Sequence, residues 1–570
     1  MSPPSRTDER TALLSDNHAN GRSYGNAADG TSSATSTPET EHRHVEVMPP
    51  LSVLAPVMVA LWVPVFVASL DGTIVATLLS SISSSFNASE QAAWLGSSYL
   101  LSVCCFTPIY GRLADIVGRK ACLLTALTFF TVGTALCGVS TSMEMLIASR
   151  AIAGMGGGGL TTTSSVIMSD LVPLKNRGLL QGLTNIIFGL GSGLGGPVGG
   201  WMNDTLGWRK AFLLQLPFLA LAYVLASCFV NIKVPVPSHG RTTMEKIRNI
   251  DFLGSVSLVV GVSSTLISLS MMSANDRTID EPIVWGGLVL GAVSTVFFFY
   301  AEKHLAPHPV LPLKLITQRT GGAVAASNLF LSIAAFATLY NFPLFFQAVK
   351  LQTASEAGLH LIPNSIGLSL GSVLAGIYMR QTGRYYWYNL VHALLTVLSI
   401  GTICFFGPQT PEWLTYLVVV PNGFGTAGVL TCTLIALINS VPRAEVAVAT
   451  SCSYLSRTSG QVLGVSFSGT LLQALLKDQL RKRIHGEGAE DIISRIRHQS
   501  HIVAELPPHL RQAAVESYSF ALRWVFVGIA VVSLCTAISS SFIEDKVLPD
   551  FEKAKKPTAD DREGLAIQGR

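Results

Sequence analysis

Long apolar stretches recur along this chain and constrain its fold more than any other feature. From residue 51 onward, short polar segments separate fourteen such stretches. They cover approximately residues 51–80, 92–110, 121–140, 146–170, 179–202, 211–231, 252–272, 283–301, 322–347, 357–379, 387–407, 413–438, 446–475 and 519–541. Each has about 20 residues or more, the length that an α-helix needs to cross a hydrocarbon core of about 30 Å. The pattern predicts an all-α integral membrane protein with about fourteen transmembrane helices and both termini on one side.

Charged residues are scarce and dispersed. They make up 13% of the 570 residues, about half of the roughly 25% found in soluble domains. The net charge is +4 and the basic residues are spread over short loops, so nucleic-acid binding is not expected. The chain has no phosphate-binding loop, no cysteines at metal-ligand spacing and no nucleophile beside a placed base. We therefore expect neither an enzyme nor a metal or cofactor.

The distribution of charge orients the chain in the membrane. If the tail at residues 1–47 is cytosolic, most Lys and Arg of the short loops are also cytosolic, and the outer loops are mainly acidic. This is the asymmetry that the positive-inside rule requires. Glycosylation sequons at Asn87 and Asn203 then fall in outer loops. The polar segment 476–518 is predicted to be a long outer loop, a kind of loop exempt from the charge rule.

Both ends of the chain are predicted to be cytosolic tails. Residues 1–47 hold almost no apolar side chains, so they cannot bury enough surface to order themselves. Residues 545–570 form the second tail. Within the first tail, Glu9, Leu13 and Leu14 resemble the acidic dileucine signal that sorting adaptors bind. This signal directs a protein to the vacuole or lysosome.

A charged decapeptide, Gly111 to Lys120, joins the second and third apolar stretches. It is too short for a domain, so we expect a cytosolic hairpin. Glycines at 111 and 118 allow its helix ends to approach closely. Asp115 can pair there with a neighbouring base, Arg112, Arg119 or Lys120. The pattern Gly-x-Leu-Ala-Asp-x-x-Gly-Arg-Lys resembles the loop between the second and third helices of major facilitator superfamily transporters.

An internal repeat supports this resemblance. Residues 376–384 reproduce the spacing of the hairpin, with Arg380 in the place of the aspartate. Parallel repeats build the two six-helix halves of a major facilitator. The resemblance therefore implies halves at residues 48–232 and 321–544, with an inserted helix pair in the linker 233–320.

Among the charged residues within apolar stretches, three are candidates for a role in transport: Asp71, Arg150 and Arg457. A charge in hydrocarbon costs at least a few kcal/mol, so each should face a cavity, a partner or a transported ion. Asp71 is the candidate for the coupling proton or a cationic substrate, unless it stays wet near the interface. Arg150 either adjusts a nearby carboxylate or extends to the outer interface. Arg457 either pairs with Asp71, binds a carboxylate, or ties helices together.

Two further segments resemble specific members of the superfamily. Gly196, Pro197, Gly199 and Gly200 resemble the Gly-Pro-x-x-Gly-Gly antiporter motif, with one residue instead of two between the proline and the glycine pair, and we expect this motif to shape a helix interface. In the family, the equivalent of Arg150 is assigned to proton transfer within Arg-x-x-Gln, but Ala153 stands here in place of the glutamine. Together with the inserted pair, these motifs resemble the fourteen-span drug:proton antiporter branch. Residues 97–101, 110–120 and 449–457 are most similar to fungal vacuolar basic amino-acid transporters.

This resemblance implies a function. The expected cargo is lysine, arginine or histidine, moved from the cytosol into the vacuole in exchange for protons, by a monomer that needs only the proton gradient. Proton-driven efflux of cationic drugs or toxins at the plasma membrane is the main alternative. A nutrient sensor that binds without transporting is a third, and the short tails do not favour it.

Overall fold

The structure is a computed structural model that describes residues 49–86, 91–231, 252–274, 279–305, 313–442, 445–486, 488–498 and 500–548. All of them belong to one compact unit. Within the described residues every regular element is a helix. A lipid-embedded backbone must satisfy its hydrogen bonds internally, which helices do. The all-α prediction is confirmed.

All fourteen predicted apolar stretches fall on helices. The principal helices are α1 (Leu51–Ser85), α2 (Ala92–Val117), α3 (Arg119–Val139), α4 (Met143–Leu171), α5 (Leu174–Leu206), α6 (Trp208–Leu213), α7 (Leu216–Phe229), α9 (Phe252–Ala274), α10 (Pro282–His304), α11 (Leu313–Thr317), α12 (Arg319–Ala348), α13 (Ala354–Leu359), α14 (Ile362–Thr382), α15 (Tyr386–Ile403), α16 (Glu412–Ser440), α17 (Val446–Arg483) and α19 (Pro508–Ser541). Two predicted stretches are each divided between two helices. Pro217 lies in the first turn of α7 and Pro363 in the first turn of α14, because proline lacks the N–H that an uninterrupted helix would use.

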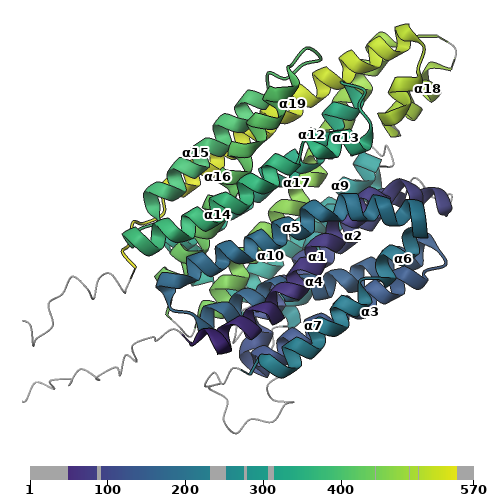
Figure 1. Cartoon of the computed structure of the whole chain (residues 1–570). Helices are drawn as coiled ribbons and strands as arrows, with labels where there is room; N and C mark the ends of the chain where they lie inside the picture. The colour runs from purple at the N-terminus through teal and green to yellow at the C-terminus, as the bar shows by residue number, and fades with distance from the viewer. Residues whose placement is uncertain are drawn as a thin grey trace, which may run out of the picture. The chain divides into compact units, whose positions relative to one another are not determined.

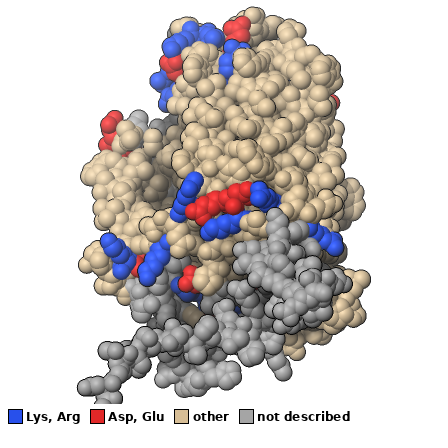
Figure 2. Space-filling model, turned by 90° about the vertical axis from the view of Figure 1, so that its left-hand side faces the viewer, with Lys and Arg blue, Asp and Glu red and all other residues tan. Residues whose placement is uncertain are grey.

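Ten helical stretches in the described part of the chain are long and apolar enough to cross a membrane. The long helices α4, α5 and α17 are outside this set, and each is rich in glycine, serine or threonine. The count of fourteen spans therefore stays a prediction. On the face shown in Figure 2, charged side chains gather at one end and in a band further down, with a broad uncharged surface between them. That surface suits contact with lipid.

The helices form two groups that follow the chain order (Figure 1). In the first group, α1 packs on α5, and α4 packs on α2 and α3. In the second, α12 packs on α17 and α19, and α16 packs on α14 and α15. The groups meet through α5 with α14 and through α2 with α17. The pair α9 and α10 packs together, and α9 also contacts α2 and α17.

The segment 476–518, predicted to be an outer loop, is mostly helical. Helix α17 continues to Arg483, α18 spans Ala489–His498, η3 spans Ser500–Glu505, and α19 already begins at Pro508. The polar composition hides an apolar stripe, so the sequence did not predict these helices, and the place of the segment outside the membrane stays a prediction. Residues 476, 480 and 484 recur at helical spacing and are buried, as expected for the inner face of a helix.

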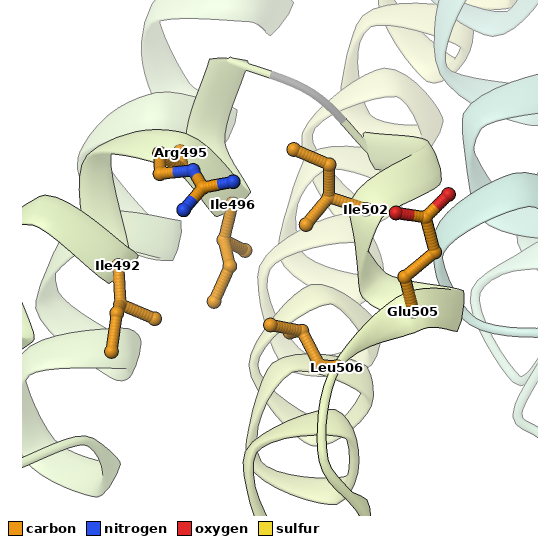
Figure 3. Close-up of a pocket in the computed structure, with 6 residues that line it drawn as sticks. All are labelled: Ile492, Arg495, Ile496, Ile502, Glu505 and Leu506. Atoms are coloured by element: carbon orange, nitrogen blue, oxygen red, sulfur yellow. The ribbon is translucent and has the colours of Figure 1, made fainter.

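A shallow pocket of about 160 Å³ lies between α18 and η3. Figure 3 shows its apolar lining of Ile492, Ile496, Ile502 and Leu506, with Arg495 and Glu505 among the lining residues. None of these residues belongs to the intramembrane charges that the sequence singles out.

The described start of the predicted C-terminal tail is docked on the helix bundle. Leu548 is fully buried and its N–H donates to the carbonyl of Gly383, at 2.9 Å. The Tyr385 hydroxyl donates to the carbonyl of Glu544 at 3.0 Å, and Arg384 pairs with Asp545 at 3.3 Å. Residues 542–548, which we call the C-terminal strap, therefore lie on the hairpin between α14 and α15.

Candidate functional site: a buried ion pair and a glycine-lined interface

Asp71 of α1 and Arg150 of α4 form a fully buried ion pair. Arg150 Nη1 donates to Asp71 Oδ2 at 2.5 Å. Asp71 has no exposed surface and Arg150 exposes 1% of its own. The pair therefore excludes two alternatives left open by the sequence: Asp71 is not wet at an interface, and Arg150 does not extend to one.

Helices α2 and α7 complete the surroundings of the pair. Gln215, just before α7, donates to Asp71 Oδ1 at 3.4 Å. Arg150 Nε donates to the carbonyl of Leu95 at 3.4 Å, and its guanidinium lies 4.3 Å from the ring centre of Tyr99. Asp71 is thus enclosed by polar groups of its own half. Its carboxylate is closed to the solvent in this state.

Position 153 packs against α3 and does not face the ion pair. Ala153 is fully buried, and a Cβ placed on Gly133 would overlap its backbone. A glutamine at 153 would have to enter this close α3–α4 contact. The departure from the Arg-x-x-Gln pattern is therefore consistent with the packing, and Gln215 supplies an amide to Asp71 instead.

The hairpin between α2 and α3 is fastened by charge. Arg119 Nη1 donates to Asp115 Oδ1 at 2.8 Å, and Arg119 Nε donates to Asp170 Oδ2 at 2.7 Å. Asp170, at the end of α4, is a partner that sequence reasoning missed. Lys120 donates to the carbonyl of Ser227 at 2.6 Å, where the last carbonyls of α7 lack partners within the helix. The hairpin thereby links α2, α3, α4 and α7.

Glycines bring the two halves into close contact at this end of the bundle. A Cβ on Gly111 of α2 would overlap the side chain of Ser451 on α17, and a Cβ on Gly376 of α14 would lie 2.6 Å from Leu179 Cα on α5. These two glycines occupy equivalent positions in the internal repeat. Gly118 has φ +90° and ψ 157°, a conformation open essentially to glycine alone. The repeated motif therefore marks two matching contacts between the halves.

The predicted antiporter motif lies on the α1–α5 interface, but its own glycines are not the closest contacts. A Cβ on Gly199 would lie 3.4 Å from Ile74, and those on Gly196 and Gly200 would lie 3.7 and 3.9 Å from Thr77. A Cβ on Gly195 or Gly191, just before the motif, would overlap α1 outright. Pro197 is inside α5. The closest approach is therefore displaced toward the start of the motif.

An apolar pocket of about 220 Å³ lies beside this interface, lined by α1, α5 and the α6–α7 segment. Gln215 is its one polar lining residue, and Leu70 and Ile74, which flank Asp71 in the chain, also line it. The pocket thus reaches the amide that bonds Asp71.

Arg457 of α17 belongs to a separate cluster in the second half and does not pair with Asp71. Its Nη2 donates to the carbonyl of Leu430 on α16 at 2.7 Å, and its Nε donates to Asn328 Oδ1 on α12 at 3.4 Å. Its guanidinium lies 5.0 Å from the ring centre of Tyr454. Arg457 is buried, with 8% of its surface exposed.

Other predicted sites are differently placed. Glu9, Leu13, Leu14 and Asn87 lie outside the described residues. Asn203, predicted to be in an outer loop, is in the last turn of α5. That helix ends at Leu206, before Gly207 with its φ of +84°, so Asn203 is helical, and its place on the outer side stays a prediction.

Comparison with known proteins assigns the chain to a family. The model of the Major Facilitator Superfamily matches residues 61–465. The chain belongs to the major facilitator superfamily. It is a multi-pass membrane transporter, and the family expected from the hairpin and its repeat is confirmed.

Relatives within the superfamily have different named functions. The chain is 37% identical to the multidrug resistance protein fnx1 of Schizosaccharomyces pombe, over 84% of this chain and 90% of fnx1. It is 36% identical to the vacuolar membrane amino acid uptake transporter fnx2 of the same yeast, over 86% and 84%. It is 32% identical to vacuolar basic amino acid transporter 1 of Saccharomyces cerevisiae, over 72% and 77%.

Solved structures share the fold. The human organic anion transporter MFSD10 aligns with a TM-score of 0.55 at 14% identity, covering 83% of this chain and 99% of that one. At this identity the likeness concerns the fold alone.

Proposed function

We propose that this transporter moves lysine, arginine and histidine from the cytosol into the vacuole in exchange for protons. Its similarity to fnx2 and to vacuolar basic amino acid transporter 1 supports the cargo and the membrane. The observation that supports proton coupling is the buried Asp71–Arg150 ion pair. Asp71 is a titratable group, and its negative charge is balanced by the positive charge of Arg150.

Protonation of Asp71 would release Arg150. A buried cation without its anion costs several kcal/mol, so the guanidinium and the groups that hold it would rearrange. Two of those groups, Leu95 and Tyr99, are on α2. The same helix reaches the contact with α17 at Gly111, 16 residues beyond Leu95, or about 24 Å along the axis. Helix α2 therefore connects the proton site to the interface between the halves.

Alternating access follows if the pair has two stable arrangements. In the structure the halves are in tight contact at the hairpin end, where Gly111 and Gly376 lie. A proton that favours one arrangement and a substrate that favours the other would shift the same equilibrium in opposite directions. That is the thermodynamic requirement for antiport.

Proton-driven efflux of cationic drugs at the plasma membrane is the second candidate. The 37% identity to fnx1 favours it, and the same ion pair would serve it equally well. The two functions differ in cargo and membrane, so one assay separates them.

The test is uptake of labelled lysine, arginine and histidine into acidified vacuolar membrane vesicles. We expect uptake that collapses when the proton gradient is dissipated and that is lost in Asp71→Asn. The matched control is Arg384→Gln, which breaks the surface pair with Asp545 and should leave uptake unchanged. Vesicles that contain the wild-type protein but take up none of the three amino acids would refute the cargo. Uptake that persists without the gradient would refute the coupling.

A further inference from the structure

We propose that Arg457, oriented by Asn328, binds the carboxylate of the transported substrate, so that the cargo must carry a carboxylate group. This inference deepens the proposed function and rests on it. The geometry that carries it is a buried guanidinium in the second half of the transporter, with no acidic partner in the described part of the chain.

The first step concerns charge. Arg150 has its anion in Asp71, and Arg119 has two, in Asp115 and Asp170. Arg457 is buried like them, yet its partners among the described residues are neutral oxygens and the ring of Tyr454. Taking a cation into a low-dielectric interior is expensive unless an anion compensates it. An anion supplied by the substrate would provide that compensation.

The second step concerns geometry. A guanidinium has five N–H donors in a planar fork that matches a carboxylate. Only two of the three nitrogens of Arg457, Nε and Nη2, donate to partners in the described structure. The bonds to Leu430 and Asn328 fix the plane of the fork, and Nη1 is left to a ligand. Arg457 also keeps part of its surface exposed, unlike fully buried Asp71.

The third step concerns rigidity. Asn328 Oδ1 accepts from Thr433 on α16 at 3.0 Å, and its Nδ2 donates to Ser453 on α17 at 3.0 Å. The amide that orients Arg457 is therefore held from two neighbouring helices. A carboxylate bound there would contact α12, α16 and α17 together. The substrate and the proton would then act on opposite halves of the molecule, the proton at Asp71 and the carboxylate at Arg457.

The assignment separates the two candidate cargoes, because a basic amino acid has a carboxylate and a simple cationic drug has none. The experiment measures competition for labelled lysine uptake by lysinamide and cadaverine, which keep the amino groups but lack the carboxylate. With wild-type protein, we expect both to compete about 10- to 100-fold more weakly than unlabelled lysine, the range of a charge-assisted hydrogen bond. Equal competition by lysine and its two analogues would overturn the inference.

Variants of Arg457 distinguish binding from a structural tie. Arg457→Gln keeps a donor for the Leu430 carbonyl but removes the charge. We expect it to raise the KM for lysine by about 10- to 100-fold. The analogues should then compete for uptake almost as strongly as lysine does, so that the ratio of their inhibition constants to that of lysine falls close to one. Arg457→Lys should restore part of that ratio. The exposed Arg495→Gln is the matched control and should change neither value. A ratio that stays at the wild-type value in Arg457→Gln would show that Arg457 is only a tie between helices.

The carboxylate site can also be tested if the proposed cargo is wrong. If wild-type vesicles take up no lysine, the purified protein is heated with leucine, glutamate and their amides. Thermal stabilisation by an amino acid but not by its amide would support the carboxylate site despite the wrong cargo. No difference between the acids and their amides would overturn it.

Discussion

Replacing Gly111 with alanine should open the transporter at the hairpin end. The added methyl would overlap the side chain of Ser451 and approach the carbonyl of Ala447 to 3.2 Å. Both belong to the first turns of α17, in the opposite half of the molecule. Overpacking by one methyl group typically costs about 1–3 kcal/mol. Separation of α2 from α17 relieves this cost. The ratio of the open to the closed population should therefore rise by about 5- to 150-fold.

The thiol of Cys104 reports this opening without further mutation. Cys104 is fully buried, and its sulfur lies 3.2 Å from the Ser459 hydroxyl of α17. A membrane-permeant maleimide should label it faster in Gly111→Ala, in proportion to the open population. Fragmentation of the labelled peptide by tandem mass spectrometry distinguishes Cys104 from the adjacent Cys105 and from the other cysteines. Gly193→Ala, where a Cβ has nothing within 4 Å, is the control and should label at the wild-type rate.

A second substitution tests the cause of the effect. Ser451→Gly removes both side-chain atoms that the new methyl would meet, so Gly111→Ala/Ser451→Gly should label within about twofold of Ser451→Gly alone, as a double-mutant cycle requires. An unchanged labelling rate in Gly111→Ala, or a fast rate that persists in the double variant, would refute the reasoning.

Three further predictions follow from the described geometry. Asp71→Asn and Arg150→Gln should each lower the free energy of unfolding by about 3–5 kcal/mol, as measured by thermal unfolding in detergent. The double variant should lose less than the sum of the two single losses. Gly118→Ala should cost about 1–3 kcal/mol in the same assay because of its backbone conformation. The hydrogen bond from Arg481 lowers the pKa of Glu490 below its ordinary value of 4.5, so the stability contributed by this pair is present above that value and is lost as the pH falls through the lowered pKa. The hydrogen-exchange protection of α18, measured relative to the intrinsic exchange rate at each pH, should therefore fall only in that acid range, and Glu490→Gln should remove this dependence.

The sequence predicted what depends on local pattern. Helices followed from apolar stretches of bilayer length, and the hairpin 111–120 and its repeat at 376–384 followed from short motifs. The partners of the intramembrane charges did not. Asp71 and Arg150 are 79 residues apart, and nothing local distinguishes Arg150 from Arg457 as the counter-charge.

Two other differences have the same physical origin. Asp170 is an ordinary acidic residue at a helix end until tertiary packing brings it to Arg119. The segment 476–518 looks like a loop by average composition, but spacing decides its structure, since its apolar residues recur every four positions. Motif matching located the α1–α5 interface through Pro197, yet the closest backbone contacts are at Gly191 and Gly195, because packing depends on which residues of a helix face its neighbour.

The C-terminal strap has a consequence for how the protein is made. The hairpin that it holds, at Arg384, emerges from the ribosome 161 residues before its partner Asp545. At about 5–20 residues per second, synthesis of that interval takes on the order of ten to thirty seconds. During this time the hairpin lacks the bonds to Asp545, Glu544 and Leu548. The second half of the transporter is therefore completed only after residue 548 has been synthesised, and a chain truncated before residue 542 would leave that hairpin without its strap.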